Sequence, residues 1–127
     1  MEAMVYQIVR KGEKVLPDLE NHGGVGTIAI QRYFGEQLPW PIDVEIWDIP
    51  PGCSEGMHVH DESDPKYGSM TEVYLILEGS AEMTIDGHLE VFARGDAVMC
   101  PGGSQHNFVN TGPDNLKVLF LSNADRE

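Results

Sequence analysis

Short apolar runs make up most of this chain, and Gly, Pro, Asn or Asp interrupts them at close intervals. Runs of about four to eight residues bounded in this way are typical of β-strands. No long stretch shows the periodicity of an amphipathic helix, and a single helical turn is expected near Gly35–Leu38. We therefore expect an all-β sandwich or barrel.

The strongest strand predictions are Val73–Leu77 and the pair Ala81–Ile85 and His88–Phe92. Asp86-Gly87 separates the pair, and this dipeptide favours a type I′ hairpin turn. The remaining strands are expected at Val5–Val9, Gly24–Phe34, Asp43–Ile49, Ala97–Cys100, Asn107–Asn110 and Leu116–Leu121.

Length and charge limit the organisation and the partners. A chain of 127 residues, 41% of them hydrophobic, suits one domain over residues 1–127 with one core. Eight basic residues against 21 acidic residues give a net charge of −13. Such a surface repels phosphate backbones and anionic lipids, so we expect neither nucleic acid nor membrane as a partner.

The sequence also predicts a compartment. Two cysteines, Cys53 and Cys100, do not form a disulfide framework, and Met1–Arg10 has no signal-peptide pattern. No run approaches the roughly 20 apolar residues that span a bilayer. We expect a cytoplasmic protein.

Three histidines and one glutamate form the candidate metal site. His58 and His60 are two residues apart, and alternate residues of a strand point to the same face. Glu72 begins the next apolar strand, and His106 follows a Pro-Gly-Gly turn. The pattern predicts one metal ion held by these four side chains.

Imidazole and carboxylate donors suit Fe, Mn, Ni, Co, Cu or Zn, and they do not choose among these ions. Four protein ligands leave positions open on a metal that prefers five or six, which permits chemistry. The other two histidines, His22 and His88, lie in glycine-rich turns and are expected at the surface.

The same residues resemble the two motifs of the cupin superfamily. The first motif spans residues 52–79, from Gly52 through the two histidines and Glu72 to Gly79. The second spans residues 95–110, where Gly95, Pro101-Gly102-Gly103, His106 and Asn110 match every position. The resemblance implies a small single-domain cupin, a double-stranded β-helix or jelly-roll barrel with the metal inside, and a homodimer.

The chain departs from the first motif at one place. Eleven residues separate His60 from Glu72, where the family has three or four, so Asp64 falls at the usual carboxylate spacing. We prefer Glu72, because it begins an apolar strand and keeps the distance to Gly79, whereas Asp64 precedes a proline. Residues 61–71 would form either a lid at the barrel mouth or a solvated acidic loop.

Four more residues are candidates for a substrate pocket: Phe108, Trp47, Arg32 and Gln105. Phe108 and Trp47 could equally be core residues, with the dimer interface as a further alternative for Trp47. Arg32 could clamp a substrate carboxylate or reach solvent from its strand end. Gln105, next to His106, could bind a ligand or only water.

The resemblance favours a metal-dependent enzyme for a small polar metabolite, by dioxygenation, isomerisation or epimerisation, decarboxylation or lyase chemistry. Glu72 would remain a ligand or move a proton, and Tyr74 would be a general acid if the cavity lowers its pKa. The alternatives are a non-catalytic barrel that binds or senses a small molecule, and a barrel that the metal only stabilises. The fold alone does not separate these functions.

Overall fold

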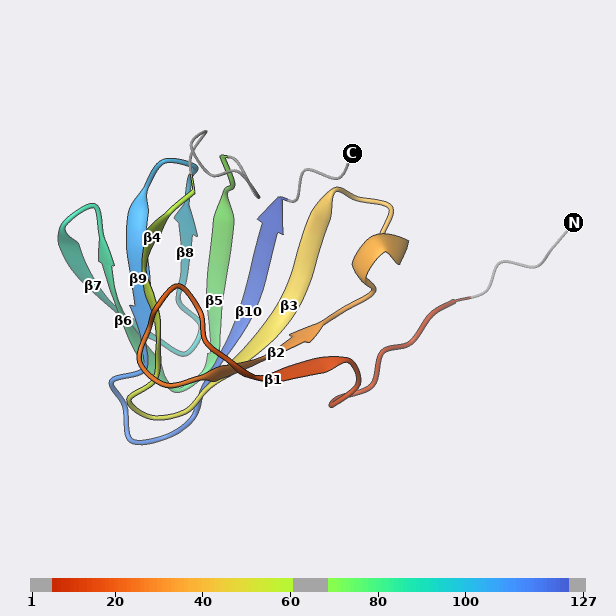
Figure 1. The fold of residues 1–127 in the computed structure, drawn as a ribbon, viewed down its shortest axis with the longest axis horizontal. Helices are drawn as coiled ribbons and strands as arrows, with labels where there is room; N and C mark the ends of the chain where they lie inside the picture. The colour runs from red at the N-terminus through yellow and green to blue at the C-terminus, as the bar shows by residue number, and fades with distance from the viewer. Residues whose placement is uncertain (1–5, 61–68, 124–127) are drawn as a thin grey trace, which may run out of the picture.

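Two antiparallel β-sheets face each other in the computed structural model, which describes residues 6–60 and 69–123 (Figure 1). The larger sheet has the strand order β1 (Val15–Leu19), β2 (Ile28–Arg32), β3 (Ile42–Ile49), β10 (Leu116–Asn123), β5 (Glu72–Glu78) and β8 (Ala97–Cys100). The smaller sheet has the order β4 (Ser54–Val59), β9 (Gln105–Val109), β6 (Ser80–Ile85) and β7 (His88–Ala93).

This arrangement is the β-sandwich of a jelly roll, so the predicted all-β fold class is confirmed. The helical part of the described residues is the short 3-10 turn η1 (Gly35–Gln37), within the stretch where a turn is expected. In the described residues no helix is long and apolar enough to cross a membrane.

The core lies between the sheets, because every second side chain of a strand points into the space between them. Trp47 of β3 stacks on Phe120 of β10 with ring centroids 4.4 Å apart. Tyr74 of β5 stacks on Phe108 of β9 at 4.8 Å, which joins the two sheets. All four side chains are buried, and the residues between them in each strand face outward.

The hairpin between β6 and β7 has the predicted turn. Ile85 pairs with His88, so the turn contains two residues. Asp86 has φ of 48° and Gly87 has φ of 84°. A type I′ turn requires positive φ at both positions, and Asp and Gly tolerate it.

The beginning of the chain differs from the prediction. Val5 lies outside the described residues, and Tyr6–Val9 belong to no strand. The first strand is β1, which contains Pro17, and a proline is tolerated there because β1 is a sheet edge. Tyr6 is 82% exposed and Ile8 is 52% exposed. Residues 6–9 therefore join no sheet of the described chain, although they favour the β conformation.

The loop between β1 and β2 lies against β4 (Figure 1). The amide of Gly56 donates to the carbonyl of Asn21 at 2.9 Å, and the amide of Ser54 donates to the carbonyl of Val25 at 2.9 Å. A Cβ on Gly24 would overlap the Ser54 carbonyl, and one on Gly56 would overlap the His22 carbonyl. Glycine at both positions allows the loop to approach β4 and places His22 over the sheet.

We predict that Gly56→Ala lowers the free energy of unfolding by at least about 2 kcal/mol, because the new methyl group forces two backbones apart. Urea unfolding followed by circular dichroism measures the change. Met57→Ala, at the exposed neighbouring position, is the control and should change stability by less than about 0.5 kcal/mol. Equal stability of both variants would show that the loop does not depend on this close approach.

Candidate metal centre

The smaller sheet contributes the three histidines of the predicted site. His58 on β4 pairs directly with His106 on β9, and their ring centroids are 4.4 Å apart. His60 follows the end of β4, with its ring centroid 4.8 Å from that of His58. Met57 and Val59 are exposed, so the histidines face the interior, as the predicted alternation requires.

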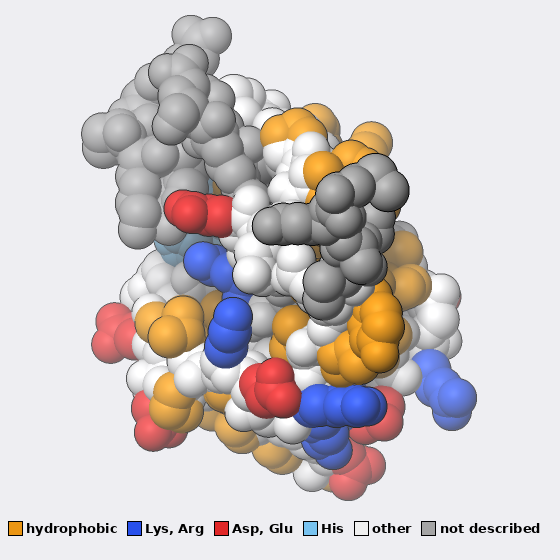
Figure 2. Space-filling view, turned by 90° about the vertical axis from the view of Figure 1, so that its right-hand side faces the viewer, with side chains coloured by type: hydrophobic (Ala, Val, Ile, Leu, Met, Phe, Trp, Pro, Cys, Tyr) orange, Lys and Arg blue, Asp and Glu red, His pale blue; other side chains and the backbone are white. Residues whose placement is uncertain are grey.

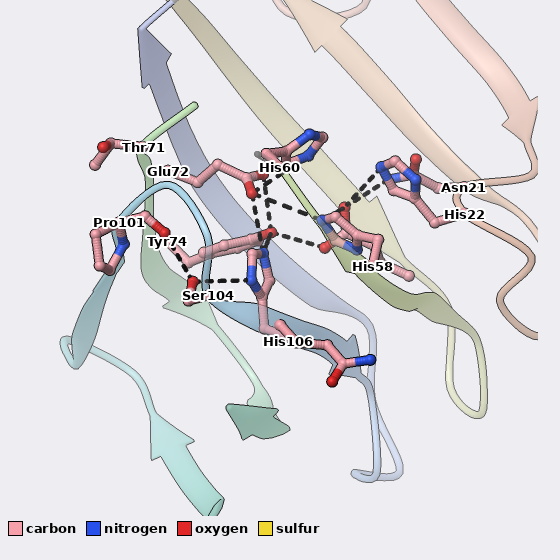
Figure 3. Close-up of polar contacts among 12 residues, drawn as sticks. Asn21, His22, His58, His60, Thr71, Glu72, Tyr74, Pro101, Ser104 and His106 are labelled. Atoms are coloured by element: carbon pink, nitrogen blue, oxygen red, sulfur yellow. Dashed lines mark hydrogen bonds and ion pairs between the residues drawn. The ribbon is translucent and has the colours of Figure 1, made fainter. Parts of the chain in front are cut away.

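Glu72 reaches the histidines from the opposite sheet, where it begins β5 (Figure 3). Its Oε1 atom lies 3.0 Å from Nε2 of His106, 3.5 Å from Nε2 of His60 and 3.6 Å from Nε2 of His58. The structure thus brings together the four residues that the sequence grouped.

The polar atoms at the centre of this cluster have no hydrogen-bond partner. Nε2 of His58, Nε2 of His60 and Oε1 of Glu72 are all buried and unsatisfied. Burying a polar atom without a partner costs about 1–3 kcal/mol, and such atoms are rare in folded proteins. Three of them around one point, all metal-ligating atom types, fit a cation that would satisfy them together.

The outer nitrogens of two rings are held by neighbouring groups. Nδ1 of His58 lies 2.8 Å from the Gly56 carbonyl, which can only accept, so this nitrogen carries the proton and Nε2 has the free lone pair. Nδ1 of His106 lies 3.5 Å from Oγ of Ser104. A second partner of this kind fixes the orientation of a metal-binding imidazole.

The charges in the cluster also suit a cation. Burial raises the pKa of Glu72, but the adjacent imidazoles of His106 and His58 outweigh burial and lower this pKa to about 2. Burial lowers the pKa of His58, yet the carboxylate of Glu72 and the hydrogen bond to the Gly56 carbonyl act in the opposite direction, and the pKa is raised. Glu72 is therefore ionised near neutral pH, which is the form that a metal ion would need.

A family model described as "Cupin domain" matches residues 45–122, more than half of the chain. The chain belongs to the cupin family. The match confirms the resemblance carried by the two motifs, and it includes all four residues of the predicted metal site.

One curated protein is similar to this cupin in sequence. The cupin is 32% identical over 74 residues to the uncharacterized protein MJ1618 of Methanocaldococcus jannaschii, a match to 58% of this chain and 54% of that protein. The chain therefore spans about half the length of this curated relative.

Two solved structures share the fold. A predicted oxalate decarboxylase from Thermotoga maritima has a TM-score of 0.78 and 23% identity, over 94% of this chain and 100% of that one. A Cupin 2 conserved barrel domain protein from Salinispora arenicola has a TM-score of 0.68 and 22% identity, over 95% and 89%. At these identities the likeness shows the fold alone.

Sequence reasoning missed Glu55, a second buried carboxylate in the cupin site. Strict alternation along β4 places residue 55 on the face opposite to His58. The pairing of β4 with β9 shifts between Glu55 and His58, which marks a β-bulge. A bulge inserts one residue and re-aims the side chains beyond it. Glu55 and His58 therefore both point inward. The signal in the sequence is Gly56, because an isolated glycine within a strand often marks a bulge.

Glu55 is held by two hydrogen bonds. The hydroxyl of Tyr74 donates to its Oε1 at 2.7 Å, and the side-chain amide of Asn21 donates to its Oε2 at 2.9 Å. Burial raises the pKa of Glu55 to about 8, although His58 and these hydrogen bonds act in the opposite direction. Glu55 and Glu72 are thus neighbouring carboxyl groups with opposite protonation near neutral pH.

Tyr74 lies behind these two glutamates. Its hydroxyl is 3.2 Å from Oε2 of Glu72 and 3.2 Å from Nε2 of His106, in addition to the bond to Glu55. Burial, followed by the charges of Glu55 and Glu72, raises the pKa of Tyr74 well above its ordinary value. From the sequence, Tyr74 is expected to act as a general acid only if the cavity lowers its pKa. The structure raises this pKa instead.

His22 is at the surface, as expected, but it also touches the site. Its ring stacks on that of His58 with centroids 3.8 Å apart and planes 8° apart. Burial of part of the ring, together with His58, lowers the pKa of His22 to about 4. His22, His58 and His60 form one group with metal-ligand spacing, and Glu55, His58 and His106 form another. His88 is exposed on β7.

A cavity of about 140 Å³ opens beside the ligand cluster. Two of the four predicted pocket residues, Trp47 and Arg32, line it. Phe108 does not, because it stacks behind Tyr74 in the core. Gln105 does not either, because it is exposed at the start of β9. The other lining residues are Leu16, Leu19, Asn21, His22, Ile30, Glu45, Glu55, His60, Met70, Glu72, Phe120 and Ser122.

The predicted alternative carboxylate, Asp64, lies outside the described residues, as does most of the insertion at residues 61–71. Met70, near its end, is buried and lines the cavity. This end of the insertion therefore forms part of the cavity wall.

We predict that Glu55 makes the metal-free protein less stable as pH rises. A folded-state pKa of about 8, above the ordinary 4.5, gives stability that is complete below pH 4.5 and lost as pH rises through 8. Glu55→Gln should remove this loss and gain on the order of a few kcal/mol over wild type between these limits. Urea unfolding at pH 5 and pH 8.5 measures it, with Glu78→Gln, at an exposed position of β5, as control. Parallel pH curves for wild type and Glu55→Gln would contradict the assignment.

Proposed function

We propose that this cupin is an enzyme that requires one divalent transition metal and acts on a small polar metabolite. The observation that carries the proposal is the convergence of the imidazoles of His58, His60 and His106 on Oε1 of Glu72, with His60 and Glu72 at the wall of a cavity. His106 completes the ligand set, because its Nε2 is the nearest imidazole nitrogen to Oε1 of Glu72.

The residues present suit Fe, Mn, Ni, Co, Cu or Zn. When bound, the metal would supply Lewis acidity or redox chemistry to an oxygen of the substrate. The cavity of about 140 Å³ lies below the roughly 300–1,000 Å³ of drug-sized pockets, so the substrate is a small molecule. His60 and Glu72 line the cavity, which places a bound molecule beside the ligand set.

In this proposal Glu55 holds the proton that the reaction moves. It lines the cavity, and its raised pKa keeps its carboxyl group protonated near neutral pH. Asn21 and Tyr74 orient the carboxyl group through their hydrogen bonds, and Tyr74 does not itself react. Glu72 stays a ligand, because its lowered pKa makes it a weak base.

A metal site beside a proton donor supports dioxygenation, isomerisation, decarboxylation or elimination. The Thermotoga maritima protein of the same fold is predicted to perform the third of these, on oxalate. A barrel that binds its ligand without turnover remains the second candidate, since a cavity beside a metal site serves binding as well as catalysis.

We predict that wild-type protein purified without chelators or a nickel column carries about one transition-metal ion per chain, because the four side chains converge on one point. His58→Ala and His106→Ala should each lose the metal, and His88→Ala, at an exposed histidine on β7, should retain it. Elemental analysis measures the stoichiometry. Full metal content in both site variants would contradict the proposed site.

The choice of carboxylate is tested separately. Glu72→Gln should weaken metal binding by at least about tenfold, because a neutral amide replaces an ionised ligand. Asp64→Asn should leave the affinity within about twofold. Competition with a coloured chelator measures both affinities, and the reverse order would assign Asp64 as the ligand.

A further inference from the structure

Resting on the proposed function, we propose that His22 hydrogen-bonds the small molecule that occupies the metal cavity. This molecule carries two oxygen groups on neighbouring carbon atoms, one at His22 and one at the ligand cluster. The ligand cluster is the group His58, His60, Glu72 and His106. His22 lies outside that group, in the loop between β1 and β2.

The turn that carries His22 is built from positive φ angles. The amide of Gly24 donates to the carbonyl of Asn21 at 3.1 Å. The two residues between them, His22 and Gly23, have φ of 53° and 68°. Glycine adopts this conformation freely, whereas histidine adopts it only at a cost. Backbone strain of this kind concentrates at functional sites, so the position of His22 points to a role for its side chain.

The backbone of the turn is anchored to β4. The amide of Gly56 donates to the carbonyl of Asn21 at 2.9 Å, and the Asn21 side chain donates to Oε2 of Glu55 at 2.9 Å. Gly24 and Gly56 have no Cβ atoms that would prevent this close approach. The fold therefore sets the position of His22 before any molecule binds.

The ring of His22 lies flat on that of His58, beside the ligand cluster (Figure 3). The ring centroids are 3.8 Å apart and the planes differ by 8°. A ligating nitrogen points at its metal within the plane of its ring, so two stacked rings cannot point at the same ion. The stacking therefore places His22 next to the ligand set and not within it.

The imidazole of His22 can bind a molecule in the cavity. Its Nε2 lies 4.0 Å from Oε2 of Glu55, which is beyond hydrogen-bond distance. Within the described residues, no hydrogen bond joins this ring to another group. The side chain is 33% exposed and lines the cavity together with His60 and Glu72. A neutral imidazole offers one donor and one acceptor nitrogen, which suit a hydroxyl or a carbonyl group.

The spacing between His22 and the ligand cluster indicates the class of molecule. The ligand atoms of His22, His58 and His60 all lie within 4.8 Å of one another. A hydrogen bond adds about 2.8 Å, so an oxygen atom bound to His22 lies close to an oxygen atom that faces the cluster. Oxygen groups on neighbouring carbons meet this condition, as in a hydroxy acid or an oxo acid with the second group next to the carboxylate.

The charges near the cavity favour recognition through a neutral group. Arg32 lines the cavity, but its guanidinium pairs with Glu45 at 2.7 Å. Figure 2 shows Lys and Arg side chains interspersed with Asp and Glu on the side of the molecule that carries η1. A mixed surface of this kind exerts little net attraction on an anion. The second oxygen group is therefore selected by a hydrogen bond to His22.

The test is a binding titration of Co²⁺-loaded protein with glycolate and with propionate, which has the same charge and a similar size but no hydroxyl group. Wild type should bind glycolate more tightly. His22→Phe keeps an aromatic ring on His58 and removes the nitrogen atoms. It should weaken glycolate by about fivefold, the effect of one hydrogen bond between neutral groups, and leave propionate within about twofold.

Two further variants complete the titration. His22→Asn suits the positive φ of the turn and so preserves the fold, but its side chain is too short to reach the position of Nε2. It should weaken glycolate as His22→Phe does. His88→Phe, at an exposed histidine on β7, is the matched control and should bind both acids as wild type does.

Equal glycolate binding by wild type and His22→Phe would overturn the inference, and so would the absence of glycolate binding to wild type. Metal content and the Co²⁺ absorption spectrum are measured in every sample, and His22→Phe should change neither. A changed spectrum or lost metal in this variant would assign His22 to the ligand set and would also overturn the inference. Normal metal content without hydroxyl preference refutes only this inference, whereas a wild type that takes up no Co²⁺ refutes the proposed function.

Discussion

The burial of one carboxylate among three imidazoles is the constraint on which the rest of this structure depends. Glu72 comes from the larger sheet and the histidines from the smaller one, so the cluster exists only if the two sheets face each other in one register. The pairing of His58 with His106 and the start of β5 at Glu72 fix that register. A slip of one residue would turn these side chains outward. The apolar core around them lowers the local dielectric and strengthens every contact in the cluster.

The cluster also holds two buried glutamates in opposite protonation states. Glu72 has imidazoles on three sides, and they lower its pKa to about 2 despite burial. Glu55 receives hydrogen bonds from Tyr74 and Asn21, but burial dominates and raises its pKa to about 8. An ionised group suits a metal ligand, and a protonated one suits proton transfer. The proposed division of roles between the two residues follows from this difference in surroundings.

The sequence predicts what depends on local pattern, and it misses what depends on distant backbone. Alternation and turn residues place the strands from β2 onward except β4, which is absent from the strands expected from the sequence, and the Asp86-Gly87 hairpin has the expected dihedral angles. The spacing of His58, His60, Glu72 and His106 brings the right residues together. The bulge that turns Glu55 inward depends on the pairing of β4 with β9. The position of His22 depends on the close approach of its loop to β4, which Gly24 and Gly56 allow. Tyr6–Val9 have strand propensity but pair with no strand of the described chain, and propensity without a partner strand forms no sheet.

The pairing of Arg32 with Glu45 shows how the core holds a charged side chain at the edge of the cavity. An arginine alone on this strand face would be free to leave for solvent, since its side chain is long and well hydrated. Glu45 is buried, so an unpaired charge there would be costly, and the pair is favoured by the removal of that cost as well as by attraction. Trp47 binds the other oxygen of Glu45 and stacks on Phe120, which links the position of the guanidinium to the core. The same packing that stabilises the sandwich therefore also sets the geometry of the cavity wall near the candidate metal site.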